Sequence, residues 1–185
     1  MKIISLHKKE EQLIALVKKQ DRASQKKMFD QFAPKMLGVC RQYVKNIHDA
    51  EDVMLCGFMK VFQNIHQFEH KGSFEGWIRK IMVFESISFL RSRKEMLFTE
   101  EVSYKETLTE DHLSFYETEA LQHMIDTLPA GCKTVFILYV IEGYKHQEIA
   151  EMLMISEGTS KSQLANARKL LQNQLKKKEF YNGAF

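Results

Sequence analysis

Apolar side chains recur every three or four positions along most of the chain, which is the spacing of an amphipathic helix. The pattern predicts a short helix that ends before Asp21 and a second run from Ser24 to about Lys45. Pro34 interrupts this second run, either as a kink or as the first turn of a new helix. Further helices are expected over about 50–65 and 74–94 and then over about 121–128, 132–142, 145–153 and 157–175. The predicted fold class is therefore all-α.

Several expected helix ends carry residues that suit a cap. Asp49 is predicted to cap a helix that begins at Ala50, because acidic side chains are stabilised at the positive end of a helix. Gly143 follows the apolar run CKTVFILYVIEGY and is expected to be its C-terminal cap. Ser156 has a side-chain oxygen suited to accept from the first free backbone N–H groups of the last helix.

The stretch from Gly143 to Leu175 has the pattern of a helix-turn-helix, with a short break at Met154 and Ile155. Leu164, Ala167, Leu170 and Leu171 are expected to face inward in the second helix. Its polar side is expected to carry Thr159, Ser160, Lys161, Gln163, Asn166, Arg168 and Lys169. A second helix rich in hydrogen-bonding side chains favours entry into a DNA major groove. A helical hairpin that only closes an all-α domain has the same periodicity.

Acidic residues dominate from Glu95 to about Glu119, where the apolar period weakens. This composition is typical of a flexible linker, so two small helical domains are expected on either side of it. The predicted organisation is an N-terminal extension with a short helix at 1–20, a first domain at 21–94, the acidic linker at 95–116, a second domain at 117–176 and a frayed tail at 177–185.

Composition and charge exclude several classes of protein. The net charge of +3 is modest, so any contact with nucleic acid must rest on local clusters of Lys and Arg. Cys40, Cys56 and Cys132 lack the spacing of a metal site or a disulfide framework, and are expected to be buried, reduced thiols. Neither a signal peptide nor a run of about 18 apolar residues occurs, so we expect a cytoplasmic protein without a membrane-spanning segment. No catalytic constellation or cofactor motif is found, and neither an enzyme nor a cofactor is expected. His66 and His70 share a helical spacing, but we expect them to be solvated or to face DNA.

A basic stripe accompanies the apolar surface of the helix expected over 74–94. Aromatic residues lie beside it, a combination that holds a phosphate backbone and unstacked bases in proteins that bind single strands. A solvated face over an aromatic core explains the same residues. The basic side chains are Arg79, Lys80, Arg91, Arg93 and Lys94.

Four runs of residues, in their order along the chain, resemble the extracytoplasmic-function sigma factors of bacterial RNA polymerase. Their residue identities are most similar to those of sigma factors of the Bacteroidota. The resemblance covers nearly the whole chain. The runs are PKMLGVCRQYVKN, DAEDVMLCGFMKVFQNI, GSFEGWIRKIMVFESISFLRSRK and LPAGCKTVFILYVIEGYKHQEIAEMLMISEGTSKSQLANARKLLQ.

The resemblance implies a role for each domain. The first domain corresponds to region 2, which binds the β′ clamp helices of core RNA polymerase and opens the minus-10 promoter element. The second corresponds to region 4, which binds the β flap and places its recognition helix in the minus-35 element, while the linker follows the RNA path. The implied polymerase-binding residues are Asp49, Glu51, Asp52, Leu55, Cys56, Phe58 and Lys60. The implied minus-10 residues are Phe68, His70, Lys71, Ser73, Trp77, Arg79, Lys80, Phe84, Ser88 and Arg91. The implied minus-35 residues are Thr159, Ser160, Lys161, Ser162, Ala165, Asn166, Arg168 and Lys169.

Within these sets the residue types indicate different tasks. Lys161 and Arg168 suit phosphate contacts, whereas Asn166 suits a base edge. Trp77 matches the tryptophan of the family, although its helical spacing favours core packing over stacking on a base.

The departures from the family gather at contact positions. Leu55 and Cys56 stand where Gln and Glu are usual, Phe84 where Asn is common, Ser88 where Asp or Asn is common, and Asn166 where Arg is common. Met154 replaces the glycine of the turn, at a cost of about 1 kcal/mol if its backbone is left-handed. Ordinary divergence toward an unusual promoter explains these changes. A more specific hypothesis is relaxed promoter readout, in which another DNA-targeting protein recruits the sigma factor.

The leading expectation is a sigma factor that directs promoter recognition, promoter opening and transcription initiation with core polymerase, with an anti-sigma factor as a further partner that family habit implies. The alternative is a stand-alone helix-turn-helix transcriptional regulator. A third hypothesis is an interaction protein that binds polymerase or an anti-sigma factor without supporting initiation. Leu55 and Cys56 keep this third hypothesis open.

Overall fold

The computed structural model describes residues 2–93 and 117–182, and the side chains of residues 9–93 and 121–176. Every regular element in those ranges is helical, which confirms the all-α class. The chain divides into two compact units, residues 1–90 and 91–185, each with its own buried core. The acidic linker predicted at 95–116 lies outside the described residues.

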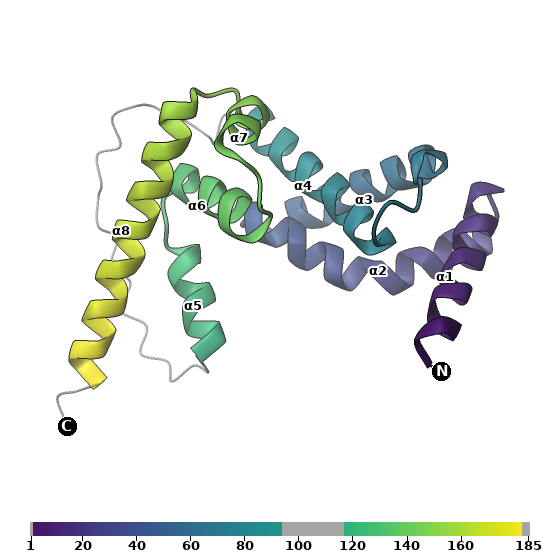
Figure 1. Ribbon diagram of the computed structural model, residues 1–185, viewed down its shortest axis with the longest axis horizontal. Helices are drawn as coiled ribbons and strands as arrows, with labels where there is room; N and C mark the ends of the chain where they lie inside the picture. The colour runs from purple at the N-terminus through teal and green to yellow at the C-terminus, as the bar shows by residue number, and fades with distance from the viewer. Residues whose placement is uncertain (1, 94–116, 183–185) are drawn as a thin grey trace. The chain divides into compact units, whose positions relative to one another are not determined.

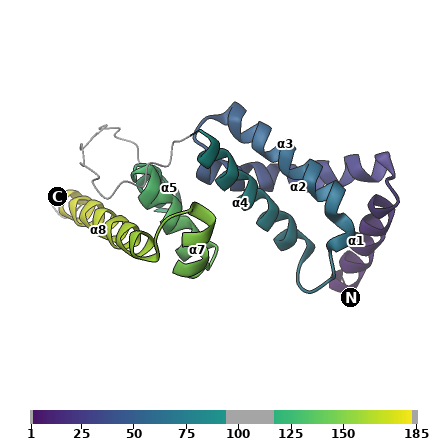
Figure 2. The ribbon, with the colours of Figure 1, turned by 90° about the horizontal axis from the view of Figure 1, so that it is seen from above.

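The first unit is built from helices that pack along their apolar faces. It contains α1 (Lys2–Lys18), α2 (Arg22–Tyr43), α3 (Ile47–Asn64), the short 3-10 helix η1 (Ile65–Gln67) and α4 (Phe74–Ser92). Figures 1 and 2 show α2, α3 and α4 alongside one another, and α1 packs against α2. The largest fully buried side chains of this unit come from α1, α2, α3, η1 and α4, and include Val17, Met28, Met36, Phe58, Ile65, Phe74, Ile78, Met82 and Ile87.

Helix α2 runs through Pro34 without ending. Proline removes one backbone donor from the helix, but Pro34 lies on the exposed side, where water satisfies the carbonyl that loses its partner. Of the two alternatives that the sequence left open, a kink at Pro34 or a new helix that begins there, the new helix is wrong.

The N-terminal cap of α3 differs from the prediction. The Oδ1 atom of Asn46 accepts from the backbone N–H groups of His48 at 2.9 Å and Asp49 at 3.2 Å. Asp49 lies in the first turn and not at the cap, so the predicted cap was wrong by one turn. The reason is local, because an asparagine three residues earlier offers the same acceptor chemistry in an extended backbone conformation.

The second unit contains α5 (Glu117–Asp126), α6 (Ala130–Phe136), its π-helical continuation η2 (Ile137–Ile141), α7 (His146–Leu153) and α8 (Glu157–Asn182). Helix α8 packs against α5, α6 and α7. Gly143 follows η2 with φ +78°, a left-handed backbone that glycine adopts without strain. The tail predicted at 177–185 begins as helix, since α8 continues to Asn182.

The turn between α7 and α8 matches the expected geometry. Met154 has φ 55° and ψ 44°, which is the left-handed conformation in which the sequence predicts strain. Ser156 Oγ accepts from the backbone N–H of Thr159 at 2.9 Å, which confirms Ser156 as the cap of α8.

The three cysteines are free thiols, but they do not share one environment. Cys40 and Cys132 are buried, whereas Cys56 is exposed, so the expectation of buried thiols was wrong for Cys56. Cys56 lies on the outward side of α3 beside the exposed Leu55. In the part of the chain that the structure describes, no helix is both long enough and apolar enough to span a bilayer.

Candidate nucleic-acid interface

Helix α8 has one buried stripe and one exposed face. The buried stripe recurs at helical spacing and consists of Ser160, Gln163, Leu164, Ala167 and Leu171. The exposed face carries five of the predicted minus-35 residues, Lys161, Ser162, Ala165, Arg168 and Lys169. The exposed face therefore presents three cationic side chains to solvent, those of Lys161, Arg168 and Lys169.

Two polar residues expected on the outer side of α8 are instead buried. The Ser160 side chain is 0% exposed and shares a 2.9 Å hydrogen bond with Nδ1 of His146 on α7. The thiol of Cys132 on α6 donates to Oε1 of the buried Gln163 at 2.8 Å. The assignment of Ser160 to DNA contact was therefore wrong, as was the placement of Gln163 on the polar side. Both lie in register with Leu164 and Ala167, and that spacing was the signal for their burial.

Thr159 and Asn166 are half-buried at one edge of the α8 face. The Thr159 hydroxyl is 2.8 Å from Ser156 Oγ, so it belongs to the cap of the helix. Asn166 and Arg168 are two positions apart, which separates them by about 160° around the helix. Arg168 therefore lies at the opposite edge of the exposed face from Asn166.

The charges of α8 are arranged in an exposed pair at its start. Lys161 Nζ lies 2.7 Å from Glu157 Oε1, one turn earlier. The hydrogen bond and the charge of Lys161 hold the pKa of Glu157 below its usual value. Both side chains are at least half exposed, and such pairs contribute little to stability, so Lys161 can exchange Glu157 for another anion.

The loop before α4 is organised by an aromatic cluster, which we define as Phe68, His70, Phe74 and Trp77. Ring centroids are 5.0 Å apart between Phe68 and Phe74, 5.7 Å between Phe74 and Trp77, and 4.6 Å between Phe68 and His70. Phe68 is buried, so its assignment to DNA contact was wrong, because its ring fills the space under the loop. Trp77 packs on Phe74 as its spacing predicts and remains half-buried.

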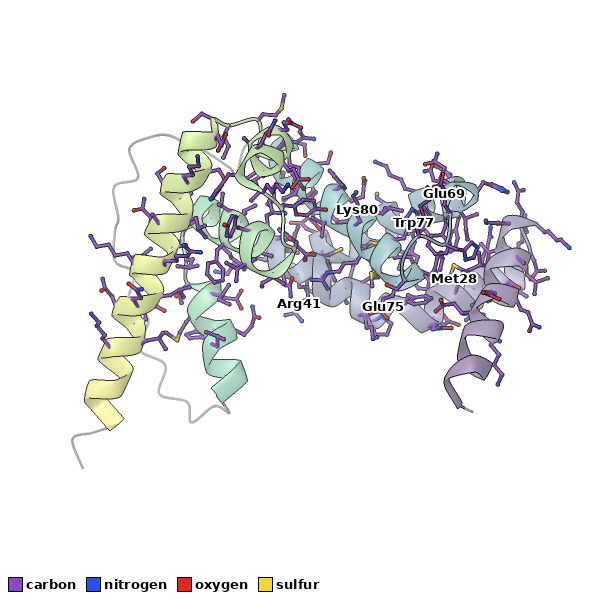
Figure 3. The ribbon with its side chains drawn as sticks, viewed as in Figure 1. Met28, Arg41, Glu69, Glu75, Trp77 and Lys80 are labelled. Atoms are coloured by element: carbon purple, nitrogen blue, oxygen red, sulfur yellow. The ribbon has the colours of Figure 1, made fainter. Side chains whose placement is uncertain are left out.

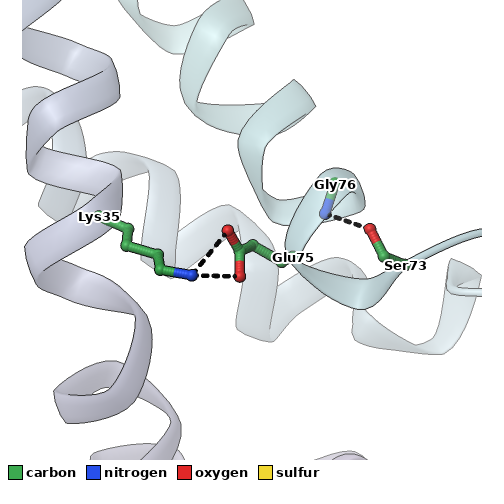
Figure 4. A network of polar contacts seen from close by, with 4 residues as sticks. All are labelled: Lys35, Ser73, Glu75 and Gly76. Carbon is green, nitrogen blue, oxygen red and sulfur yellow. Dashed lines mark hydrogen bonds and ion pairs between the residues drawn. The ribbon is translucent and has the colours of Figure 1, made fainter.

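Polar residues of the same loop and helix start are engaged locally. Ser73 Oγ accepts from the backbone N–H of Gly76 at 3.0 Å, and Lys35 of α2 binds Glu75 at 2.9 Å (Figure 4). Lys71 pairs with Glu69 at 2.7 Å at the exposed loop. His70 is exposed with φ 58°, so the loop presents His70 and Lys71 to solvent while Phe68 anchors it.

Helix α4 presents a single exposed stripe, which we call the α4 stripe. It consists of Lys80, Phe84, Ser88 and Arg91, at intervals of four, four and three residues. Phe84 is 42% exposed, so part of its ring is accessible at the surface. Figure 3 shows Lys80 and Trp77 on the side of α4 away from Glu75. Arg79 is half-buried on the flank of this stripe.

The polymerase-binding residues predicted on α3 separate into two groups. Glu51, Asp52, Leu55 and Cys56 are exposed and Asp49 is half-buried. Phe58 is only 2% exposed, with its ring 4.8 Å from that of Phe29, so its assignment to a polymerase contact was wrong. Lys60 reaches back to Glu85 of α4 at 2.5 Å and ties the two helices together.

Met59 is an exposed residue that the sequence reasoning missed. It is 61% exposed and lies one turn beyond Leu55, whose side chain is also exposed. We define Asp52, Leu55, Cys56 and Met59 as the α3 face. The spacing from Leu55 was the available signal, but an apolar residue in an amphipathic helix is normally assigned to the core.

Both units match known families at the residues that carry these surfaces. Residues 28–95 match Sigma-70 region 2, and residues 118–171 match Sigma-70, region 4. The two matches define the class of protein as a sigma-70 type initiation factor with two separate promoter-facing regions.

Individual relatives agree with this class. RNA polymerase sigma factor SigV of Bacillus subtilis is 32% identical over 139 residues, which cover 74% of this chain and 82% of SigV. ECF RNA polymerase sigma factor SigW of Bacillus subtilis is 29% identical over 177 residues, covering 88% of this chain and 95% of SigW. The structure of the sigma factor RpoE in complex with the anti-sigma factor NepR from Bartonella quintana covers 82% of this chain and 96% of the RpoE chain, with 22% identity and a TM-score of 0.49. The chain belongs to the extracytoplasmic-function RNA polymerase sigma factors.

Membership in the family favours the sigma factor over the stand-alone regulator that the sequence left open. The chain works with RNA polymerase and directs promoter recognition, and its DNA-binding helix-turn-helix is region 4. A stand-alone regulator is not favoured, because such a protein does not need the region 2 match over residues 28–95. Sigma factors are initiation factors rather than enzymes, which agrees with the expectation from the motifs.

Proposed function

We propose that this sigma factor binds the polymerase clamp through the α3 face and contacts promoter DNA at two points, the α4 stripe and the exposed face of α8. The observation that carries the proposal is the sidedness of α8. Lys161, Arg168 and Lys169 are exposed together, while the base-reading candidate Asn166 is half-buried at the edge. The minus-35 contact accordingly rests more on phosphates than on base edges.

The α4 stripe fits the minus-10 side of the same task. Lys80 and Arg91 supply cations at its two ends, and the exposed ring of Phe84 offers a surface on which an unstacked base can lie. Phe84 has no hydrogen-bonding group where Asn is common in the family, and Ser88 offers a single hydroxyl where Asp or Asn offers two polar atoms. The minus-10 contact is therefore expected to tolerate more sequences.

The α3 face fits a partner whose surface is partly apolar. Leu55 and Met59 expose large apolar side chains one turn apart, and Asp52 adds an acidic group at the end of the row. Each fully buried aliphatic side chain stabilises an interface by roughly 1.5–3 kcal/mol. Burial of Leu55 and Met59 can therefore replace the polar contacts of the Gln and Glu that are usual in the family at positions 55 and 56.

Reconstitution of the full chain with core polymerase tests the DNA contacts. Lys161→Gln and Arg168→Gln should each weaken binding to all promoters similarly and reduce the slope of log affinity against log salt by about 0.9. Lys26→Gln is the matched control, since Lys26 also makes an exposed pair one turn away, with Asp30 at 2.6 Å. Equal effects of Lys26→Gln and Lys161→Gln would contradict the proposed minus-35 surface.

Sequence preference is tested separately on a promoter library. Asn166→Arg and Phe84→Asn should each sharpen the preference of the holoenzyme at the minus-35 and minus-10 elements, respectively. An unchanged preference in both variants would mean that these departures do not affect readout.

Co-purification with core polymerase tests the α3 face. Leu55→Gln and Met59→Gln should each weaken binding to core by about tenfold, because each loses apolar area and buries an unpaired amide in the contact. Leu16→Gln is the control, as Leu16 is similarly exposed on α1. A run-off transcript from the reconstituted holoenzyme then separates a working initiation factor from a protein that only binds polymerase.

A second candidate function is recruitment of the holoenzyme by another DNA-targeting protein, a hypothesis that the departures at Phe84, Ser88 and Asn166 motivate. Genome-wide binding of the tagged chain tests it. One sharp minus-35/minus-10 motif shared by all bound sites would exclude recruitment.

A further inference from the structure

Three side chains from three elements of the second unit form a stack, which we call the Tyr139 stack. The ring of Tyr139 on η2 lies on that of His146 on α7, with centroids 4.5 Å apart and planes inclined by 24°. The guanidinium Cζ of Arg168 on α8 lies over the Tyr139 ring, 5.8 Å from its centroid. Tyr139 and His146 fall outside the sets that the family resemblance assigned to DNA.

The stack is fixed at its far end by a partly buried hydrogen bond. His146 Nδ1 and Ser160 Oγ form a hydrogen bond of 2.9 Å, and Ser160 has no exposed surface. His146 is the first residue of α7, so the ring is tied to both helices of the helix-turn-helix. Ser160 and Arg168 are eight residues apart on α8, about 12 Å along the helix axis.

The π-helical turn explains why Tyr139 is at the surface. Within η2 the backbone N–H of Glu142 bonds to the carbonyl of Ile137, five residues earlier, at 3.0 Å. The wider turn leaves Tyr139, Val140 and Ile141 exposed in succession, whereas Ile137 and Leu138 are buried. Single π-helical turns of this kind are frequent at functional sites.

A guanidinium that lies over a ring uses its plane for the aromatic contact and keeps its N–H donors at its edge. Those donors remain available for a phosphate, in the fork geometry that favours two parallel hydrogen bonds. A lysine can meet a phosphate only as a point charge, because its ammonium lacks the planar fork that forms two parallel hydrogen bonds. Holding the long arginine side chain in one orientation also lowers the entropy lost on contact.

We propose that Tyr139 is a positioning residue for promoter binding. Its ring holds the Arg168 guanidinium at the edge of the α8 face, in an orientation that lets the guanidinium bind a phosphate. This inference rests on the proposed function, in which Arg168 contacts the minus-35 backbone. His146 and Ser160 keep the Tyr139 ring in place.

A double-mutant cycle on the full chain with core polymerase and a promoter fragment tests the proposal. Tyr139→Leu should weaken promoter binding by about two- to fivefold and should reduce the salt slope, whereas Tyr139→Phe, which keeps the ring, should bind like the parent. On the Arg168→Gln background, Tyr139→Leu should have no further effect. Arg168→Lys should lose as much as Tyr139→Leu. Tyr144→Leu is the matched control, because Tyr144 lies in the same connection but is not part of the stack.

The outcomes separate this inference from the function on which it rests. If Arg168→Gln binds promoter like the parent, the phosphate contact itself is wrong and the inference falls with it. If Arg168→Gln weakens binding but Tyr139→Leu weakens it further by the same factor on that background, Tyr139 acts through the fold and only the inference is overturned. Thermal unfolding of each variant identifies any loss of fold. The Tyr139→Phe and Arg168→Lys arms stay decisive if Tyr139→Leu unfolds.

Discussion

Gly57 on α3 lies against Met82 on α4, so closely that a Cβ atom at Gly57 would be 2.4 Å from Met82 Sδ. Met82 is completely buried, so its side chain has little room to move away. The contact joins the helix that carries the α3 face to the helix that carries the α4 stripe. The space that the Met82 side chain occupies against α3 therefore depends on the absence of a side chain at Gly57.

Gly57→Ala should lower the free energy of unfolding of the first unit by about 1–2 kcal/mol, because overpacking outweighs the gain in helix propensity. Gly38→Ala on α2 is the matched control. Nothing lies within 4 Å of a Cβ there, so this variant should gain up to about 1 kcal/mol. Urea unfolding followed by fluorescence measures both, since Trp77 is the single tryptophan of the chain. Stabilisation by both alanines would contradict the close contact.

Met154→Gly should stabilise the second unit by up to about 1 kcal/mol. The left-handed backbone of Met154 is strained for any residue with a Cβ, and its side chain is 79% exposed, so little packing is lost. Met152→Gly, inside α7, is the control and should destabilise by about 1 kcal/mol. Thermal unfolding followed by circular dichroism compares the two glycines. A loss of stability in Met154→Gly would mean that the turn does not store strain.

Asn46→Ala should lower the stability of the first unit by about 1 kcal/mol, because two backbone N–H groups of α3 lose their acceptor. Asn46→Asp keeps an acceptor in the same place and should be nearly neutral. Urea midpoints from Trp77 fluorescence measure the difference. The result would count against Asn46 as the cap if alanine and aspartate behaved alike.

The stability of the first unit should fall as the pH rises from about 9 to 11. Burial raises the pKa of the Cys40 thiol from 9.0 to about 11, and a hydrogen bond with Ser86 opposes the rise only in part. Below pH 9 the thiol keeps its proton in both states, so the full stability is present. Between pH 9 and 11 only the unfolded state releases the proton, which costs up to roughly 2 kcal/mol.

Cys40→Ala removes that titration, so the stability difference between parent and variant should shrink with pH over this window. Urea unfolding at pH 8 and pH 10.5 measures it. Cys56→Ala is the control, because it removes an exposed thiol rather than a buried one. A difference between parent and Cys40→Ala that is constant with pH would contradict the raised pKa.

The helices and the helix-turn-helix could be predicted from the sequence because their causes are local. An apolar period of three to four residues, the cap at Ser156 and the positive φ at Gly143 depend on neighbours within a few positions. Local reasoning placed the cap of α3 at Asp49 and missed the equivalent asparagine three residues earlier. The continuation of α8 to Asn182 was also missed, since a run of lysines does not by itself end a helix.

The sequence by itself determined the all-α class, the strained turn at Met154 and the family. Helical spacing, and motifs in a fixed order along the chain, can be identified from the residues alone. Only the tertiary structure decided which of the candidate contact residues reach the surface. Ser160 and Phe58 have suitable chemistry but lie in the core, where His146 and Phe29 are their partners. Such partners lie on other helices, and burial of a polar or aromatic side chain is favourable only once those helices meet. For the same reason the Tyr139 stack, which joins η2, α7 and α8, could not be read from the spacing of any one helix.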